Sequence, residues 1–385
     1  MPDRPVGVTD HRPEKSFGGA TLFCHSYEDP QAGEGGVAHM YLVDMEGRPV
    51  HEWTARTAVQ LLELLPDGTL CYTTRDRSNI DAAGLYKLAP DSSVLWHYHC
   101  RIDHDFHLAS DGRLTIHCLL DRMVPRLGTE LRRNPYIVEI GPEKELAWEW
   151  HGEGHLDELA DLVGLELPID WPAREQREAT QLRQWRPDLQ EMDDAVFHQF
   201  TQHLIAQRTF DWAHNNTCEV LPHSPTAASD SRFRAGNILF SYRSLDIIGV
   251  IDRRSGEIVW AWGPGELDGQ HQPTMLPSGH IMVFDNGTRR GWSRVIQLDP
   301  ATGEITWEYH GEPKPSFYSP FISGAQLLPN GNVLVCSGGQ RRVFEVTAEG
   351  EVVWDFWSPY GRPGTYGIYR ATRYSDEAVQ ALLRG

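Results

Sequence analysis

A short pattern recurs six times along the chain and limits its possible folds more than any other feature. Each copy reads as a turn followed by a strand rich in β-branched and aromatic residues. The copies are GRPVHEW (47–53), SSVLWHY (92–98), KELAWEW (144–150), GEIVWAW (256–262), GEITWEY (303–309) and GEVVWDF (350–356). The last three begin 47 residues apart, at Gly256, Gly303 and Gly350. A period in the forties indicates a repeat architecture.

A second pattern, a turn that leads into an apolar strand, follows most copies of the first. It reads LLPDGTLCYT (64–73), LASDGRLTIHC (108–118), MLPSGHIMVFD (275–285) and LLPNGNVLVCS (327–337), with a stretched version from Val220 to Tyr242. Other short strands that end in turns lie between the two patterns. Four strands per repeat and six repeats predict an all-β fold, a six-bladed β-propeller in which residues 1–385 form a single domain.

The repeat is interrupted once, between Trp148 and Trp260. Residues 152–211 are charged and Leu-rich and contain helix-like segments such as HLDELADLVGLEL and EATQLRQW, with proline breaks between them. We expect a helical insertion over one mouth of the propeller, where it could act as a lid. A surface insertion without a function is the alternative.

Polar residues occupy one equivalent place in five repeats, five residues before the leucine in the turn of the second pattern, or before Ala109 in the copy LASDG. They are Gln60, His104, Asn216, His271 and Ser323. The innermost strands of a propeller begin at one rim of the channel, so these side chains should converge on the axis. His214 lies two residues before Asn216 and should point to the same face of its strand. Because buried polar groups need partners, a functional site is expected here.

The residue types at this place limit the chemistry. An imidazole can act as a general base, a nucleophile or a metal ligand near neutral pH. Arg243, on the strand NILFSYRS of the same repeat as His214, could bind a tetrahedral oxyanion such as a sulfate or phosphate ester. The sequence contains no Walker motif, GxGxxG, GxSxG or HExxH, so no nucleotide cofactor is expected.

Several segments together resemble the bacterial arylsulfotransferases, which move a sulfuryl group from one aryl sulfate to another phenol without a nucleotide sulfate donor. The resemblance rests on DHDFHLASDG, DWAHNNTCEVLP with the downstream FSYR, GQHQPTMLPSGHIMVFDNG and GIYRATRY, and it spreads over roughly residues 40–375. It implies a six-bladed propeller and a central histidine, here His271, that is transiently sulfated. The other site groups that it implies are His104, His214, Asn216 and Arg243. Ser244 departs from the pattern, because another histidine is expected there.

The resulting expectation is sulfuryl transfer with four catalytic residues, His271, His104, His214 and Arg243. His271 attacks the sulfur of an aryl sulfate, and the other three hold the sulfuryl oxygens and stabilise developing charge. The expected substrate-binding residues are Asn216, Gln60, Ser323 and Asn286. No cofactor is required by this reaction.

Two alternatives stay open. In the first, the histidines act as acid and base in a lyase or hydrolase on an aromatic or saccharide substrate, with a divalent metal held by His104, His214 and His271. In the second, the propeller is a binding module without catalytic activity, and the polar ring only lines the channel.

Charge and targeting signals bear on the partners. The chain has 54 acidic and 35 basic residues and a net charge of −19, which argues against nucleic acid or an anionic membrane as the main partner. The expected partner is a small aryl compound. The sequence shows no secretory signal, and its six cysteines form no CxxC pair, so a cytoplasmic location is expected. The oligomeric state is left open.

Overall fold

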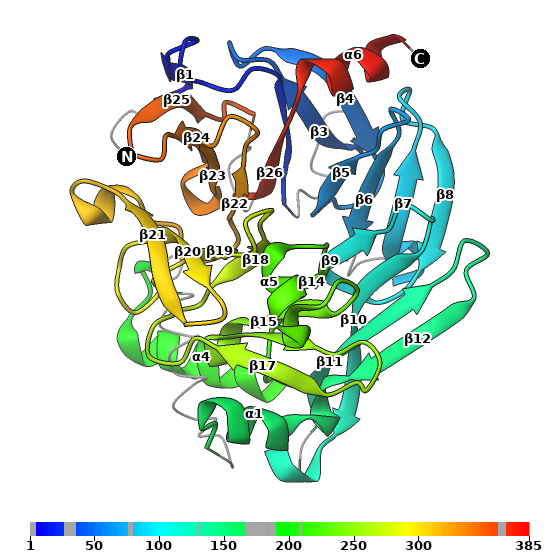
Figure 1. The fold of residues 1–385 in the computed structure, drawn as a ribbon. Helices are drawn as coiled ribbons and strands as arrows, with labels where there is room; N and C mark the ends of the chain where they lie inside the picture. Colours follow the sequence, from blue (N-terminus) through cyan, green and yellow to red (C-terminus); the bar gives the residue numbers. More distant parts are fainter. Residues whose placement is uncertain are drawn as a thin grey trace.

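Six antiparallel sheets surround a central axis and confirm the six-bladed β-propeller that the repeats predict (Figure 1). The structure is a computed structural model, and it describes residues 5–26, 36–75, 80–129, 131–166, 183, 190–207, 210–360 and 367–384. Each sheet is one blade, numbered here in chain order.

The blades follow one another along the sequence. Blade 1 contains β2 (Ala20–His25), β3 (Ala38–Val43) and β4 (Pro49–Ala55), and blade 2 contains β5 (Leu62–Leu64), β6 (Leu70–Thr74), β7 (Gly84–Leu88) and β8 (Val94–His99). Blade 3 contains β9 (Ile102–Leu108), β10 (Leu114–Met123), β11 (Leu131–Ile140) and β12 (Leu146–His151). Blade 4 contains β14 (Asn215–Val220), β15 (Ile238–Tyr242), β16 (Ile247–Ile251) and β17 (Ile258–Trp262). Blade 5 contains β18 (His271–Met275), β19 (Ile281–Asp285), β20 (Arg294–Asp299) and β21 (Glu304–His310). Blade 6 contains β22 (Gly324–Leu327), β23 (Val333–Ser337), β24 (Arg342–Val346) and β25 (Val352–Trp357).

Each end of the chain adds one strand to a blade whose other strands come from the opposite end of the sequence. The C-terminal strand β26 (Ile368–Tyr374) pairs with β2 and supplies the innermost strand of blade 1. The N-terminal strand β1 (Gly7–His11) pairs with β25 and adds a fifth, outermost strand to blade 6. Two separate strand pairings therefore close the ring.

The two sequence patterns have distinct places in each blade. The first pattern forms the fourth strand of each blade, which is the outermost strand except in blade 6, and its tryptophans connect neighbouring blades. The indole N–H groups of Trp150, Trp307 and Trp354 each donate to a backbone carbonyl of the next blade at 2.8 Å. The second pattern forms the hairpin between the two inner strands. At Gly279 the hairpin needs a residue at φ 89°, a conformation that glycine adopts without strain.

In the described part of the chain, four α-helices lie beside the sheets. The insertion contributes α1 (Leu156–Val163), which buries Leu156 against Trp150 beside blade 4, and α4 (Asp194–Gln207). A short helix, α5 (Pro225–Ser229), lies in the β14–β15 connection, and α6 (Asp376–Arg384) ends the chain. The segment HLDELADLVGLEL therefore contains a helix as expected, while most of EATQLRQW lies outside the described residues. No helix in the described part of the chain is both long and apolar enough to cross a membrane.

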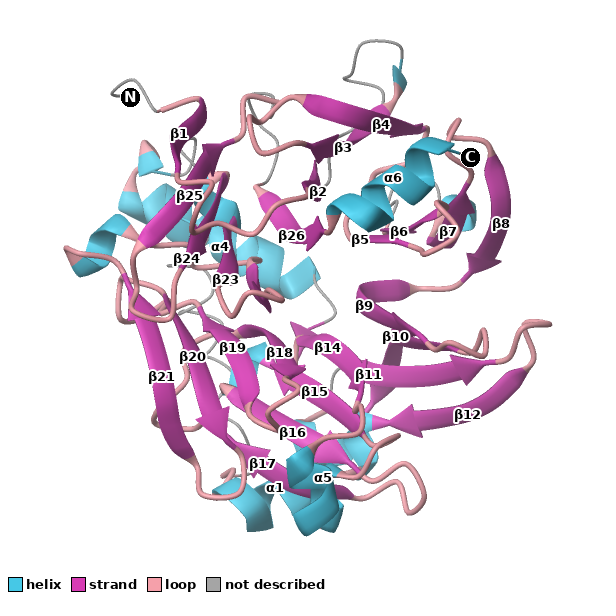
Figure 2. Cartoon of the chain, turned by 45° about the horizontal axis from the view of Figure 1, so that its top comes forward, coloured by secondary structure: helices cyan, strands magenta, loops and turns pink. Residues whose placement is uncertain are grey.

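The helices mark the two faces of the ring. Figures 1 and 2 together show α5 and α6 on one face and α4 on the other. The α5 face carries the hairpins that end the innermost strands, so α4 lies on the face where those strands begin. This is the face on which the polar ring is expected. That the insertion acts as a lid stays a prediction.

We predict that Arg373→Met destabilises the fold by about 3–5 kcal/mol, the usual loss when one partner of a buried ion pair is removed. The fully buried Arg373 side chain on β26 donates to Thr21 Oγ1 and to the Phe17 carbonyl, both at 2.7 Å, and pairs with Glu345 at 3.6 Å. It therefore ties the C-terminal strand to the N-terminal segment and to blade 6.

Denaturant unfolding measures this loss, and the exposed Arg254→Met is the matched control. A difference of less than 1 kcal/mol between the two variants would contradict the role given to this contact.

Candidate active site

The polar residues expected at the channel lie at the start of five different innermost strands. Gln60 precedes β5, His104 and Asn216 lie near the starts of β9 and β14, His271 begins β18, and Ser323 precedes β22. All five are buried, with exposed fractions of 5% or less. The count from the hairpin turn thus placed them correctly along the strands.

The backbone is unusual at this level of the channel. Five non-glycine residues from four blades have positive φ here: His104 (65°), His214 (50°), Gln272 (47°), Ile322 (48°) and Ser323 (88°). The pairing of β9, β14 and β18 with their neighbours is also irregular here. Left-handed backbone and bulges gather at functional sites, where they redirect side chains. Strand alternation alone therefore does not describe where these side chains point.

His271 has a single defined tautomer because of its partner, Asn286. The Asn286 amide nitrogen donates to the carbonyls of Ser319 at 2.6 Å and Ile322 at 2.9 Å. Its oxygen therefore faces His271 Nδ1, 2.7 Å away, and must accept a hydrogen bond from it. In the neutral ring the proton lies on Nδ1, and Nε2 keeps its lone pair.

The surroundings of His271 favour the neutral ring. Burial is the main reason why its pKa lies well below the ordinary imidazole range, and the positive charge of Arg243 lowers the pKa further. His104 and His214 are also close enough to lower the pKa, whereas the hydrogen bond to Asn286 opposes the shift. Arg243, His104 and His214 thus all act electrostatically on His271.

His214 forms a pair with Asp211 at the end of β13 (Phe210–Asp211). One carboxylate oxygen of Asp211 accepts the backbone N–H of His214 at 2.9 Å, and the other lies 3.0 Å from His214 Nδ1. Burial raises the pKa of Asp211, but His214 outweighs this effect and holds the pKa below its usual value. The ring of His214 meets that of His104 edge to face, with 4.7 Å between the centroids.

His104 contacts the neighbouring Asp103. Its Nδ1 lies 2.7 Å from Asp103 Oδ2, in close contact but without the alignment of a hydrogen bond. The other oxygen, Oδ1, lies 2.6 Å from Arg75 Nη1. Burial lowers the pKa of His104 to about 3 although Asp103 opposes it. Burial raises the pKa of Asp103, but Arg75 and His104 outweigh it, so this carboxyl stays ionised.

Three buried residues, one of them His104 of the polar ring, form a possible metal-binding group. Asp103, His104 and His117 are buried and offer ligand atoms within 4.8 Å of one another. This set differs from the expected His104, His214 and His271. A cation would need the Asp103 carboxylate as a ligand, but this carboxylate already forms an ion pair with Arg75. The metal-dependent alternative stays a prediction.

Two expectations about backbone placement are wrong. Arg243 does not lie on a strand: β15 ends at Tyr242, and Arg243 begins the following turn, where its Nη2 lies 3.5 Å from the Pro320 carbonyl. His214 lies before β14 and not on it, so the two-residue spacing to Asn216 does not fix its direction. Each of these two residues lies one position outside the end of its strand, at the rim of the channel.

The expected substrate-binding side chains differ in their surroundings. Asn216 donates to the Gln270 carbonyl at 2.8 Å, and Ser323 Oγ accepts the Gly338 N–H at 3.0 Å. The Asn286 side chain is fully engaged with His271 and the two carbonyls given above. Among the described residues, neither amide atom of Gln60 has a hydrogen-bond partner although both are buried. Of the four expected substrate-binding residues, Gln60 is therefore the one whose side-chain amide can form hydrogen bonds with a substrate.

Charged channel residues deeper on the innermost strands were not anticipated. Arg370 of β26 pairs with Asp105 of β9 at 3.1 Å, and Asp105 also accepts the Cys218 N–H at 3.0 Å. Glu219 accepts the Met275 N–H at 2.9 Å. Arg370 was missed because β26 has no turn of the second pattern after it. Counting back from its pairing with β2 would have found it.

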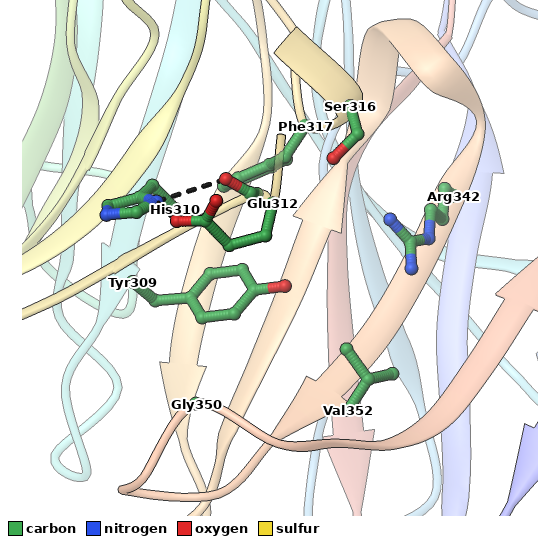
Figure 3. Close-up of a pocket in the computed structure, with 9 residues that line it drawn as sticks. Tyr309, His310, Glu312, Ser316, Phe317, Arg342, Gly350 and Val352 are labelled. Atoms are coloured by element: carbon green, nitrogen blue, oxygen red, sulfur yellow. Dashed lines mark hydrogen bonds and ion pairs between the residues drawn. The ribbon is translucent and has the colours of Figure 1, made fainter. Parts of the chain in front are cut away.

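A surface cavity lies away from this site, between blades 5 and 6 (Figure 3). It has a volume of about 280 Å³ and is lined by residues that include Tyr309, Phe317 and Arg342. His310 and Glu312 face each other at its edge, 3.3 Å apart. None of the expected site residues lines it.

The fold and the site define a six-bladed propeller with clustered imidazoles at one end of its channel. The family model described as arylsulfotransferase (ASST) matches residues 170–359, just under half of the chain. The match and the six-bladed fold confirm the arylsulfotransferase resemblance and suggest a transferase. Among curated proteins, none matches the chain.

Comparison with solved structures agrees on the fold. A protein of unknown function from Bacteroides caccae is 11% identical, with a TM-score of 0.53 over 92% of this chain and 100% of its own. Virginiamycin B lyase from Staphylococcus aureus is 11% identical, with a TM-score of 0.40 over 92% of this chain and 89% of its own. The first likeness supports the fold alone, and the second is too weak to support any argument.

We predict that Glu219→Gln stabilises the protein at pH 8 but not at pH 4.5. Burial raises the pKa of Glu219 from 4.5 to about 7, with a further contribution from Asp105 and an opposing one from Arg370. A raised folded-state pKa means that stability is retained below pH 4.5 and is lost as pH rises through 7. A glutamine oxygen can still accept the Met275 N–H. The expected gain at pH 8 is up to about 3 kcal/mol.

Thermal unfolding across this pH range tests the prediction, with the exposed Glu349→Gln as the control. A stability difference that does not change with pH would contradict it.

Proposed function

We propose that this protein transfers a sulfuryl group from an aryl sulfate to a phenolic acceptor through a sulfohistidine at His271. The observation that carries the proposal is the pinned amide of Asn286, whose oxygen can only accept from Nδ1. A buried, neutral imidazole with its lone pair on Nε2 is suited to attack an electrophilic sulfur. The family match supports the same class of reaction.

The neighbours of His271 suit an anionic group. The Arg243 guanidinium and the imidazoles of His104 and His214 lie close enough to influence its charge. The guanidinium N–H groups of Arg243 can donate to the sulfuryl oxygens and stabilise their negative charge during transfer. In a buried site this stabilisation is stronger than in water.

The reaction proceeds in two displacements. His271 Nε2 forms a bond to sulfur while the bond from sulfur to the aryl oxygen breaks, and the phenolate leaves with the electron pair. The ring becomes a sulfoimidazolium that keeps its proton on Nδ1, because the Asn286 amide oxygen is not basic enough to remove it. The acceptor phenol then attacks sulfur, and its proton ends on the released phenolate or in solvent. The electron pair of the sulfur–nitrogen bond returns to His271.

The partner of His271 Nδ1 is the neutral amide of Asn286 and not a carboxylate, and this difference affects the sulfohistidine. A carboxylate beside Nδ1 would draw the proton away from the ring and make the sulfohistidine a poorer leaving group. Asn286 fixes the tautomer without adding charge, so the bond between sulfur and nitrogen stays labile. The donor and the acceptor can therefore exchange one sulfuryl group in both directions.

We predict that His271→Asn abolishes transfer from an aryl sulfate to a phenol and lowers its rate by several orders of magnitude, because asparagine cannot form the covalent intermediate. Mass spectrometry after mixing with donor alone should detect one added sulfuryl group on the wild-type peptide that contains His271. His280→Asn, a substitution in the hairpin of the same blade, is the matched control and should retain both properties.

Two results would contradict the proposal. One is a wild-type enzyme that turns over donor in the presence of acceptor but never carries the adduct. The other is activity that disappears with a chelator and returns with a divalent ion, which would favour the metal-dependent lyase or hydrolase.

A further inference from the structure

Asp211 has a position that sequence reasoning did not assign to the site. It ends β13, which runs parallel to Arg132 and Arg133 of β11, and it lies three residues before His214. We propose that Asp211 is a positioning residue that makes His214 the proton acceptor for the incoming phenol. This inference rests on the proposed sulfuryl transfer and concerns its second displacement.

The two oxygens of Asp211 have separate tasks. The backbone N–H of His214 donates to Oδ1 at 2.9 Å, which fixes the carboxylate in one orientation. Oδ2 then faces His214 Nδ1 at 3.0 Å. An ionised carboxylate only accepts hydrogen bonds, so Nδ1 carries the proton of the neutral ring and Nε2 presents a lone pair.

The local backbone holds this arrangement. His214 has a left-handed φ of 50°, which is rare for a residue with a side chain. Its carbonyl accepts the Arg243 N–H at 3.3 Å, and the preceding carbonyl, of Ala213, accepts the Ser244 N–H at 3.1 Å. The same turn that bonds to Asp211 thus aims the imidazole at the ring of His104.

Exposure separates His214 from the other two imidazoles. Its side chain is 29% exposed, compared with 6% for that of His104, and the whole His271 residue is only 4% exposed. A base that receives the proton of an incoming phenol must also return that proton to the leaving phenolate or to solvent. His214 is the imidazole of the three that solvent reaches most easily.

The charge of its partner also favours His214. The Asp103 carboxylate beside His104 is shared with Arg75, and His271 has a neutral amide. Among the ion pairs of the described residues, Asp211 pairs with His214 and with no other residue. The negative charge of Asp211 is therefore shared with no other cation among these ion pairs, and it lies beside the imidazole that takes the proton.

The proposed step balances in atoms and charge. The phenol oxygen forms a bond to sulfur as its proton moves to His214 Nε2, and the bond between sulfur and His271 Nε2 breaks. His214 is then an imidazolium beside Asp211. In the next cycle it gives this proton to the phenolate that leaves the donor, or it releases the proton to solvent.

Asp211→Asn provides a sharp test, because the backbone N–H of His214 keeps the amide oxygen at the Oδ1 position. The amide NH₂ must then face His214 Nδ1 and force the proton onto Nε2. Long-range proton–nitrogen NMR of the imidazoles, assigned with a His214→Gln variant, should show Nδ1–H in the wild type and Nε2–H in Asp211→Asn. The exposed Asp91→Asn, which also removes a carboxylate that accepts a backbone N–H, is the control and should leave both tautomer and rate unchanged.

Single-turnover rates provide the second measurement. With preformed sulfo-enzyme, Asp211→Asn should slow transfer to weakly acidic phenols by about 10²–10⁴-fold, the usual contribution of general acid–base catalysis. The loss should shrink as the acceptor phenol becomes more acidic, because less help with its proton is needed. A purely structural role for Asp211 would slow transfer to all acceptors equally.

The outcomes are distinguishable from failure of the proposed function. An Nε2–H tautomer of His214 in the wild type, or equal rate losses for all acceptors, would overturn the role of Asp211 even if His271 carries the adduct. If no adduct forms on His271, sulfuryl transfer fails, and the catalytic role of Asp211 fails with it. The wild-type tautomer remains decisive for the positioning should Asp211→Asn not fold.

Discussion

Closure of the ring is the constraint on which the rest of this molecule depends. Six blades bury their faces only against one another, so the first and last must meet. The chain achieves this twice, with β26 inside blade 1 and β1 outside blade 6. Closure also brings Arg370 from the C-terminal strand to Asp105 of blade 3, and it forces six strand starts to one end of the channel. The site depends on this arrangement, because its imidazoles come from three consecutive blades, with His104 from blade 3, His214 from blade 4 and His271 from blade 5.

The three imidazoles at that end are chemically different because their Nδ1 partners differ. His271 donates to a neutral amide, His104 contacts a carboxylate shared with an arginine, and His214 contacts a carboxylate of its own. For His271 and His214 another protein group fixes the orientation of the partner, so the tautomer of these two imidazoles follows from the fold. We propose that this arrangement separates a nucleophile, His271, from a base, His214. The same residue type can perform both tasks because burial and partner charge set the properties of each ring.

The sequence contained most of the fold and part of the site. The 47-residue period and the outer-strand tryptophans predicted six blades, and the count from the hairpin turn located His104 and His271. The interpretation of NILFSYRS as a strand was wrong for Arg243, which lies past the end of β15, because a change from strand to turn leaves no periodic signal. Asp211 was also missed, since its pairing with His214 requires a left-handed residue that spacing does not reveal. The sequence patterns predicted which strands meet at the channel. They did not predict the tautomers and ion pairs, because these depend on local backbone geometry.

In the proposed reaction, sulfuryl transfer passes through a covalent histidine rather than directly between two phenols. The most direct measurement is the stereochemical course at sulfur, with a donor whose sulfuryl group is chiral through its oxygen isotopes. Each in-line displacement inverts the configuration, so two displacements through His271 predict overall retention. Inversion would require a single direct transfer, and it would contradict the account even if His271 proved essential for activity.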